Sequence, residues 1–96
     1  MTAPDAVLAD LRDRIDTLDA ILVQTLAERF RQTARVGRLK AAHALPAFDP
    51  GREEAQIERL ETLAAEAGLD PALARDILGL ITDRVKENHR KISGEQ

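Results

Sequence analysis

The chain of 96 residues contains no cysteine, no tryptophan and no tyrosine, and its two phenylalanines are Phe30 and Phe48. The absence of cysteine excludes disulfides, thiolate chemistry and metal sites built on cysteine. Leu, Ile, Val and Ala therefore supply most of the apolar surface, and with many Glu, Arg and Gln residues they favour helix throughout. A chain of this length forms one domain at most. Its core alone would be marginal, so a second chain would supply the missing burial.

Long apolar runs and an excess of positive charge are also missing. No run approaches the roughly 20 apolar residues that span a membrane, and the N-terminus has no basic-then-apolar signal pattern. The net charge is -3, with acids and bases mixed along the chain, whereas nucleic-acid binding usually needs a clustered basic face. We therefore expect a soluble, cytoplasmic protein that binds neither nucleic acid nor a membrane, while small anionic ligands remain compatible with it.

Two Asp-Pro pairs, Asp49-Pro50 and Asp70-Pro71, divide the chain. Each pair predicts a helix start, because Asp suits the N-cap and Pro suits the first helical position. Gly68 precedes the second pair, where a left-handed glycine can end the preceding helix. The sequence thus predicts a single all-α domain with its core over about residues 7–92. Its three helices span about residues 5–42, 50–67 and 71–92.

The first predicted helix is too long for one small domain. No proline occurs between Pro4 and Pro46, and Gly37 is the one weak position, at a cost of about 1 kcal/mol against alanine. At 1.5 Å per residue such a helix is roughly 55 Å long, whereas a domain of about 100 residues has a radius of gyration of about 13 Å. Its apolar residues recur at steps of three and four, as in a seam between two helices. The seam consists of Leu8, Leu11, Ile15, Leu18 and Leu22. A second copy would cover it, which predicts a homodimer.

Several charged residues share faces of these helices. Arg29 and Lys40 are eleven positions apart, close to three full turns, and therefore lie along one face. Arg12 is turned roughly a quarter-turn from Arg29, so it could serve a partner's pocket if the first helices run antiparallel. On the third helix, His89 follows Val85 by four residues and lies on the inward face.

Each of these residues also has an ordinary structural interpretation. A single Arg in a helical chain that is 32% charged usually lies on a solvated face. Asp49 is first an N-cap, and Glu53 near a helix start complements the helix dipole. An inward histidine such as His89 is more often a core residue than a catalytic one. No single residue therefore identifies a function.

Short segments follow one another along the chain. They are LRDRIDTLD at 11–19, LAERF at 26–30, VGRLK at 36–40, DPGRE at 49–53 and IERL at 57–60. Together, in this order and at these separations, they resemble the all-helical chorismate mutase family. The resemblance implies an entwined homodimer that rearranges chorismate to prephenate, in the shikimate pathway toward aromatic amino acids, with no cofactor and no metal.

The resemblance also implies a role for each polar residue in these segments. Arg29 of one protomer and Arg12 of the other would each bind a substrate carboxylate, since Arg can hold a carboxylate through two parallel hydrogen bonds. Glu53 would accept the ring hydroxyl, with Asp49 beside it. Arg52 would be a further basic residue lining the pocket.

The remaining residues would act at the reacting end of the substrate. Lys40 would lie at the ether oxygen, and Val36 and Val85 would contact the substrate. In the family a Gln is often the second donor to this oxygen, preceded one turn earlier by a Ser; here His89 and Val85 occupy those positions. Asn88 is the neighbouring polar candidate, but it lies about 100° off the inward face, so we favour His89. A neutral imidazole donates one hydrogen bond and a protonated one donates two, which predicts a rate that depends on pH.

Two alternatives remain open. An isochorismate-pyruvate lyase would share the fold and bind nearly the same ligand, but the long polar loop of such lyases is not evident in the short segment 41–48. A non-catalytic helical dimerisation or regulatory module would not need the set of charged residues named above. Substitution of Lys40 would impair catalysis in an enzyme and have no measurable effect in such a module.

Overall fold

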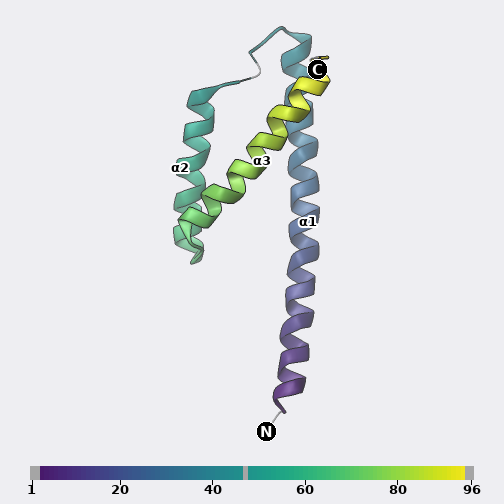
Figure 1. The fold of residues 1–96 in the computed structure, drawn as a ribbon, viewed down its shortest axis with the longest axis vertical. Helices are drawn as coiled ribbons and strands as arrows, with labels where there is room; N and C mark the ends of the chain where they lie inside the picture. The colour runs from purple at the N-terminus through teal and green to yellow at the C-terminus, as the bar shows by residue number, and fades with distance from the viewer. Residues whose placement is uncertain (1–2, 47, 95–96) are drawn as a thin grey trace. The chain divides into compact units, whose positions relative to one another are not determined.

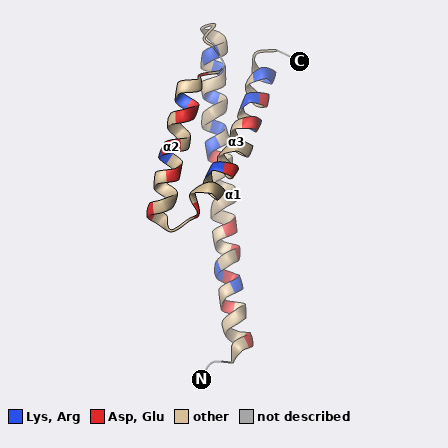
Figure 2. Ribbon diagram, turned by 60° about the vertical axis from the view of Figure 1, so that its left-hand side comes forward, with Lys and Arg blue, Asp and Glu red and all other residues tan. Residues whose placement is uncertain are grey.

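The computed structural model describes residues 3–46 and 48–94 and consists of three α-helices (Figure 1). α1 spans Pro4–Ala42, α2 spans Pro50–Ala67 and α3 spans Pro71–Ile92, and the described residues contain no strand. The predicted all-α class and the predicted helix boundaries are confirmed. Acidic and basic residues are interspersed along each helix (Figure 2). Among the residues described, no helix has both the length and the apolar composition needed to cross a membrane.

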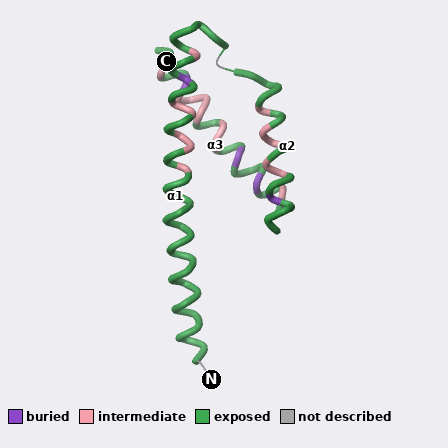
Figure 3. The backbone as a smooth tube through the Cα atoms, turned by 180° about the vertical axis from the view of Figure 1, so that it is seen from behind, coloured by how far each residue is buried: buried purple, intermediate pink, exposed green. Residues whose placement is uncertain are grey.

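The chain forms two compact units, one ending at Gln32 and the other beginning at Thr33. The first unit is the N-terminal part of α1, and every described residue up to Thr25 is exposed (Figure 3). The predicted apolar seam is among them, and Leu18 is 62% exposed. Removing apolar side chains from water lowers the free energy. A regular stripe of them is therefore typical of a surface that another helix covers.

The second unit contains the last turns of α1 together with α2 and α3. Its core lies between α2 and α3, where Ala64, Ala74 and Leu78 are buried and Leu78 is only 2% exposed. Alanines at a helix crossing allow the two backbones to approach closely, because the distance between helix axes depends on the side chains at the contact.

Both predicted helix starts are confirmed by their hydrogen bonds. A carboxylate oxygen of Asp49 accepts the backbone N–H of Arg52 at 3.1 Å, and one of Asp70 accepts the backbone N–H of Ala72 at 3.0 Å. Gly68 has φ 77° and ends α2 in the left-handed conformation. These caps satisfy backbone groups that the end turns of a helix otherwise leave unpaired.

Two side chains of α3 that lie against the α1 backbone explain the glycine in the long helix. Gly37 is the one buried residue of α1, all of which the structure describes. A Cβ atom at this position would lie 2.7 Å from Cδ2 of His89 and 3.1 Å from Cδ1 of Ile92. No carbon atom fits there unless its neighbours move. The position that looks weak in the sequence is therefore required by the packing of His89.

A tight turn ends α1 at Ala42, two residues after Lys40. The backbone N–H of Leu45 donates to the carbonyl oxygen of Lys40 at 2.8 Å. Ala44 has φ 53°, and among the described residues it is the one non-glycine with a positive φ. The turn is similar to the common helix end in which a left-handed glycine follows the last turn, with alanine in place of glycine. The backbone carbonyl of Lys40 is thereby hydrogen-bonded to a residue that follows the helix.

Candidate active site

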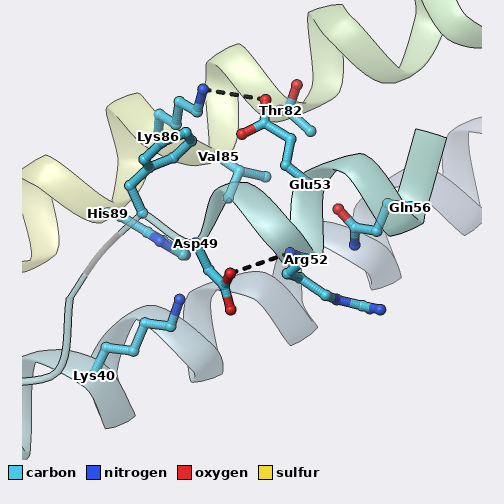
Figure 4. A pocket seen from close by; sticks show the side chains of 10 residues that line it. Lys40, Asp49, Arg52, Glu53, Gln56, Thr82, Val85, Lys86 and His89 are labelled. Atoms are coloured by element: carbon cyan, nitrogen blue, oxygen red, sulfur yellow. Dashed lines mark hydrogen bonds and ion pairs between the residues drawn. The ribbon is translucent and has the colours of Figure 1, made fainter.

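A cavity of about 130 Å³ lies in the second unit and is lined by residues of all three helices (Figure 4). α1 contributes Lys40 at its C-terminal end. The start of α2 and the residues just before it contribute Phe48, Asp49, Arg52, Glu53 and Gln56, and α3 contributes Thr82, Val85, Lys86 and His89. From Asp49 to Gln56 and from Thr82 to His89 the steps are three, one and three residues, which places each set on one helix face.

The start of α2 holds two carboxylates at the edge of this cavity. Asp49 uses one oxygen for its cap bond to Arg52 N–H, so the helix start also fixes this carboxylate beside the cavity. Figure 4 shows the Asp49 carboxylate and the Lys40 ammonium pointing toward one another, while the Arg52 guanidinium points away from them. The side chain of Glu53 is 27% exposed and lies one turn further into the helix.

Lys86 on α3 lies between an acid and an aromatic ring. Its Nζ is 3.2 Å from Oε1 of Glu53 and 4.6 Å from the centroid of the Phe48 ring. A cation over a ring face is attracted by the negative face of the π-system, so Phe48 favours the same position of the ammonium as Glu53 does. The two residues together hold Lys86 against the start of α2.

The hydrogen bond of His89 restricts what its ring can do. Nε2 lies 2.8 Å from the carbonyl oxygen of Thr33, and the residue is only 9% exposed. Because a carbonyl oxygen only accepts, Nε2 carries the hydrogen in this contact. In the neutral ring Nδ1 is then an acceptor, and the single donor of the neutral imidazole is already used. His89 can donate to a ligand only when it is protonated.

The charge around the cavity is positive although the whole chain is acidic. Three cations, Lys40, Arg52 and Lys86, face two carboxylates, Asp49 and Glu53, which gives +1 with His89 neutral (3 − 2 = 1), against -3 for the chain. A local excess of cations favours an anionic ligand.

Outside the cavity, a hydrogen bond to Glu61 and the charge of that carboxylate raise the pKa of Arg75 above its usual value.

Most of the residues predicted from the sequence meet at this cavity, namely Lys40, Asp49, Arg52, Glu53, Val85 and His89. Val36 is not a lining residue and is 45% exposed on α1. Arg12 and Arg29 belong to the first unit, whereas the cavity is made by the second unit alone. Asn88, the alternative to His89, does not line the cavity.

Four residues that line the cavity were not predicted from the sequence, namely Phe48, Gln56, Thr82 and Lys86. A signal for three of them was present. Gln56 follows Glu53 by three residues, and Thr82 and Lys86 each precede a predicted site residue by three, so extending each helix face by one turn finds them. Phe48 lies before the helix, where no periodicity applies.

Comparison of the sequence with known proteins finds one family and several relatives. The sequence family described as chorismate mutase type II matches residues 11–90. The T-protein of Haemophilus influenzae is 39% identical over 71 residues, which cover 74% of this chain and 19% of that protein. The 4-amino-4-deoxychorismate mutase of Streptomyces venezuelae is 32% identical over 74 residues, covering 77% of this chain and 72% of that protein. The chorismate mutase of Methanocaldococcus jannaschii is 28% identical over 79 residues, covering 82% and 80%. The chain spans about a fifth of the length of the T-proteins that it matches.

Proposed function

Because the chain belongs to the chorismate mutase type II family, we propose that it rearranges chorismate to prephenate. The observation that supports this most directly is the cavity, where cations and carboxylates from three helices meet. Chorismate carries two carboxylates, a ring hydroxyl and an ether oxygen, so a ligand of this kind needs several cations and at least one acceptor. The cavity offers both.

The reaction is a Claisen-type rearrangement within one molecule, which requires no nucleophile and no net proton transfer. A carbon–oxygen bond breaks as a carbon–carbon bond forms, and negative charge gathers on the ether oxygen in the transition state. A fixed cation near that oxygen lowers the barrier, because its charge interacts more strongly with the transition state than with the substrate. In this proposal Lys40 supplies that cation, and neither a cofactor nor a metal takes part.

The other residues bind and orient the substrate. Glu53 accepts the hydrogen bond of the ring hydroxyl, with Asp49 beside it, and Arg52 adds positive charge for a carboxylate. Val85 gives the ring an apolar contact. Holding both ends of the molecule selects the folded, reactive conformer, which saves the entropy of reaching it in the transition state.

His89 acts as the second donor to the ether oxygen in its protonated form. Its Nε2–H is used by Thr33, so the donor toward the substrate is Nδ1–H of the imidazolium. The imidazolium adds a positive charge as well as a hydrogen bond at the point where negative charge develops. The neutral ring offers neither.

The proposed enzyme is a homodimer. The exposed seam of α1, in which Leu18 is 62% exposed, supports this assembly, because a long apolar stripe favours packing against a second helix. In this assembly Arg12 and Arg29 bind substrate carboxylates, as the family resemblance implies. Light scattering tests the assembly. The natural chain should have the mass of two chains, and Leu18→Glu should shift it to one, whereas a natural chain with the mass of one chain would contradict the dimer.

The activity is tested with purified protein and chorismate, without added metal or cofactor, by separate assays for prephenate and pyruvate. Prephenate formation supports the proposal. Pyruvate released from isochorismate, with little prephenate from chorismate, would identify an isochorismate-pyruvate lyase instead. Binding of chorismate without turnover would identify a non-catalytic module and would overturn the proposed activity.

A further inference from the structure

We propose that Lys86 makes the cavity select a substrate with a hydroxyl group over one with an ammonium group at the ring position that Glu53 contacts. The inference rests on the proposed function, and it deepens that function by naming a residue that determines the substrate. Its premise is the contact between Lys86 Nζ and Glu53 Oε1 at 3.2 Å. Glu53 is thus a carboxylate that already has a cation beside it.

The relatives of this chain are named for two substrates that differ in one ring substituent. One is named for chorismate and another for 4-amino-4-deoxychorismate, a compound in which an amino group replaces the hydroxyl of ring carbon 4. An alkyl amine of this kind is protonated at neutral pH, whereas the hydroxyl is uncharged. A lone carboxylate would favour the ammonium form, because opposite charges attract.

The surroundings of Glu53 reverse this preference. A hydroxyl can donate to the free Oε2 of Glu53 without meeting any repulsion from Lys86. An ammonium placed on the same carboxylate would lie within a few ångströms of a second cation, and like charges so close disfavour binding. The Phe48 ring, whose centroid lies 4.6 Å from Nζ of Lys86, favours the present place of this ammonium. No other lysine lines the α3 side of the cavity among the described residues.

The same geometry explains why a second lysine lines the cavity although it has no role at the ether oxygen. Lys40 comes from α1 and Lys86 from α3, and Figure 4 shows Lys86 beside Glu53 and Lys40 beside Asp49. Lys86 thus pairs with Glu53, whereas Lys40 lies on the Asp49 side of the cavity. We assign Lys40 to the reacting bond and Lys86 to the recognition of the ring substituent.

The test compares chorismate and 4-amino-4-deoxychorismate as substrates of the natural chain, Lys86→Met and Lys86→Gln at pH 7. Removing the charge should raise the ratio of kcat/KM for the amino compound to that for chorismate by about tenfold or more, a modest value because Lys86 is partly exposed and solvent screens its charge. Lys91→Met is the matched control, since Lys91 is an exposed lysine of α3 that does not line the cavity. Its ratio should equal that of the natural chain.

Other outcomes separate this inference from the proposed function. A ratio that stays within twofold in both Lys86 variants overturns the role of Lys86, even if chorismate is converted. If the natural chain converts neither compound, the proposed function fails, and the same ratio is then measured as Kd values by calorimetry. An unchanged Kd ratio again overturns the inference, and a tenfold change supports it. The Gln variant is included because it keeps a hydrogen-bond donor for Glu53 if Met disturbs folding.

Discussion

Nε2 of His89 lies 2.8 Å from the carbonyl oxygen of Thr33, which is one helical turn before Gly37. The ring of His89 therefore rests on the α1 backbone where Gly37 leaves room, with its Cδ2 only 2.7 Å from where a Cβ would be. A single side chain thus joins α3 to α1 and lines the cavity as well. Substitutions at Gly37 and at His89 should therefore affect packing and catalysis in different ways.

Gly37→Ala should destabilise the protein. Overpacking in a closed space costs about 1–3 kcal/mol, while alanine gains about 1 kcal/mol over glycine in a helix, so the free energy of unfolding should fall by up to about 2 kcal/mol. Urea denaturation measures it. Gly79→Ala is the control, since nothing lies within 4 Å of a Cβ at that helical position. It should stabilise the protein by about 0.5–1 kcal/mol. Equal effects at both positions would contradict the packing argument.

Lys40→Met should lower kcat with little effect on folding. Loss of one donor to a developing oxyanion typically lowers kcat about a hundredfold to a thousandfold, and Lys40 is the residue assigned to the ether oxygen. Steady-state kinetics with chorismate measures the loss, and Lys91→Met serves as the control outside the cavity. A change confined to KM would show that Lys40 binds the substrate and its transition state equally.

The rate should fall as the pH rises from 5 to 8. In the proposal the imidazolium of His89 donates to the ether oxygen and the neutral ring does not, so loss of this proton should lower kcat. The charged groups that line the same cavity are Lys40, Arg52, Lys86, Asp49 and Glu53. In His89→Gln the profile of kcat against pH should become flat, because an amide donates without titrating. His43→Gln, at an exposed histidine, should keep the natural profile. A flat profile in the natural chain would remove the role of His89 as a charged donor.

Asp49→Ala and Asp70→Ala should have equal effects on stability and different effects on catalysis. Each removes one N-cap hydrogen bond of similar length, 3.1 Å and 3.0 Å, and loss of a cap typically costs about 1 kcal/mol. Only Asp49 lines the cavity. Thermal unfolding should therefore show similar shifts, while kcat/KM for chorismate should fall in Asp49→Ala alone. Equal activities would mean that Asp49 acts only as a cap.

The helices could be predicted well from the sequence because their ends carry local signals. Asp49-Pro50, Asp70-Pro71 and Gly68 act through backbone groups within a few residues, so their effect does not depend on the rest of the fold. The polar residues of the cavity could be found for a related reason, since fixed helical spacing places them on common faces. These predictions needed only the geometry of one helix.

What could not be predicted depends on pairs of residues that are far apart in the chain. The ion pair of Lys86 with Glu53 joins residues 33 positions apart, and the bond of His89 to Thr33 joins residues 56 positions apart. Helical spacing shows that a side chain lies on a face, but it does not show which partner it meets there. The need for a glycine at position 37 follows from such a long-range contact and has no local signal.

Ala44 adopts a left-handed backbone conformation that an alanine rarely takes. A left-handed backbone disfavours an alanine by about 1–2 kcal/mol, yet this residue completes the turn in which Leu45 N–H reaches the carbonyl oxygen of Lys40. Such conformations persist where their surroundings determine them, and they gather near functional sites. The cation assigned to the reaction therefore lies two residues before a helix end that a backbone hydrogen bond from Leu45 closes. Because alanine samples fewer backbone conformations than glycine, it adds strain to the folded turn but loses less conformational entropy when the turn forms.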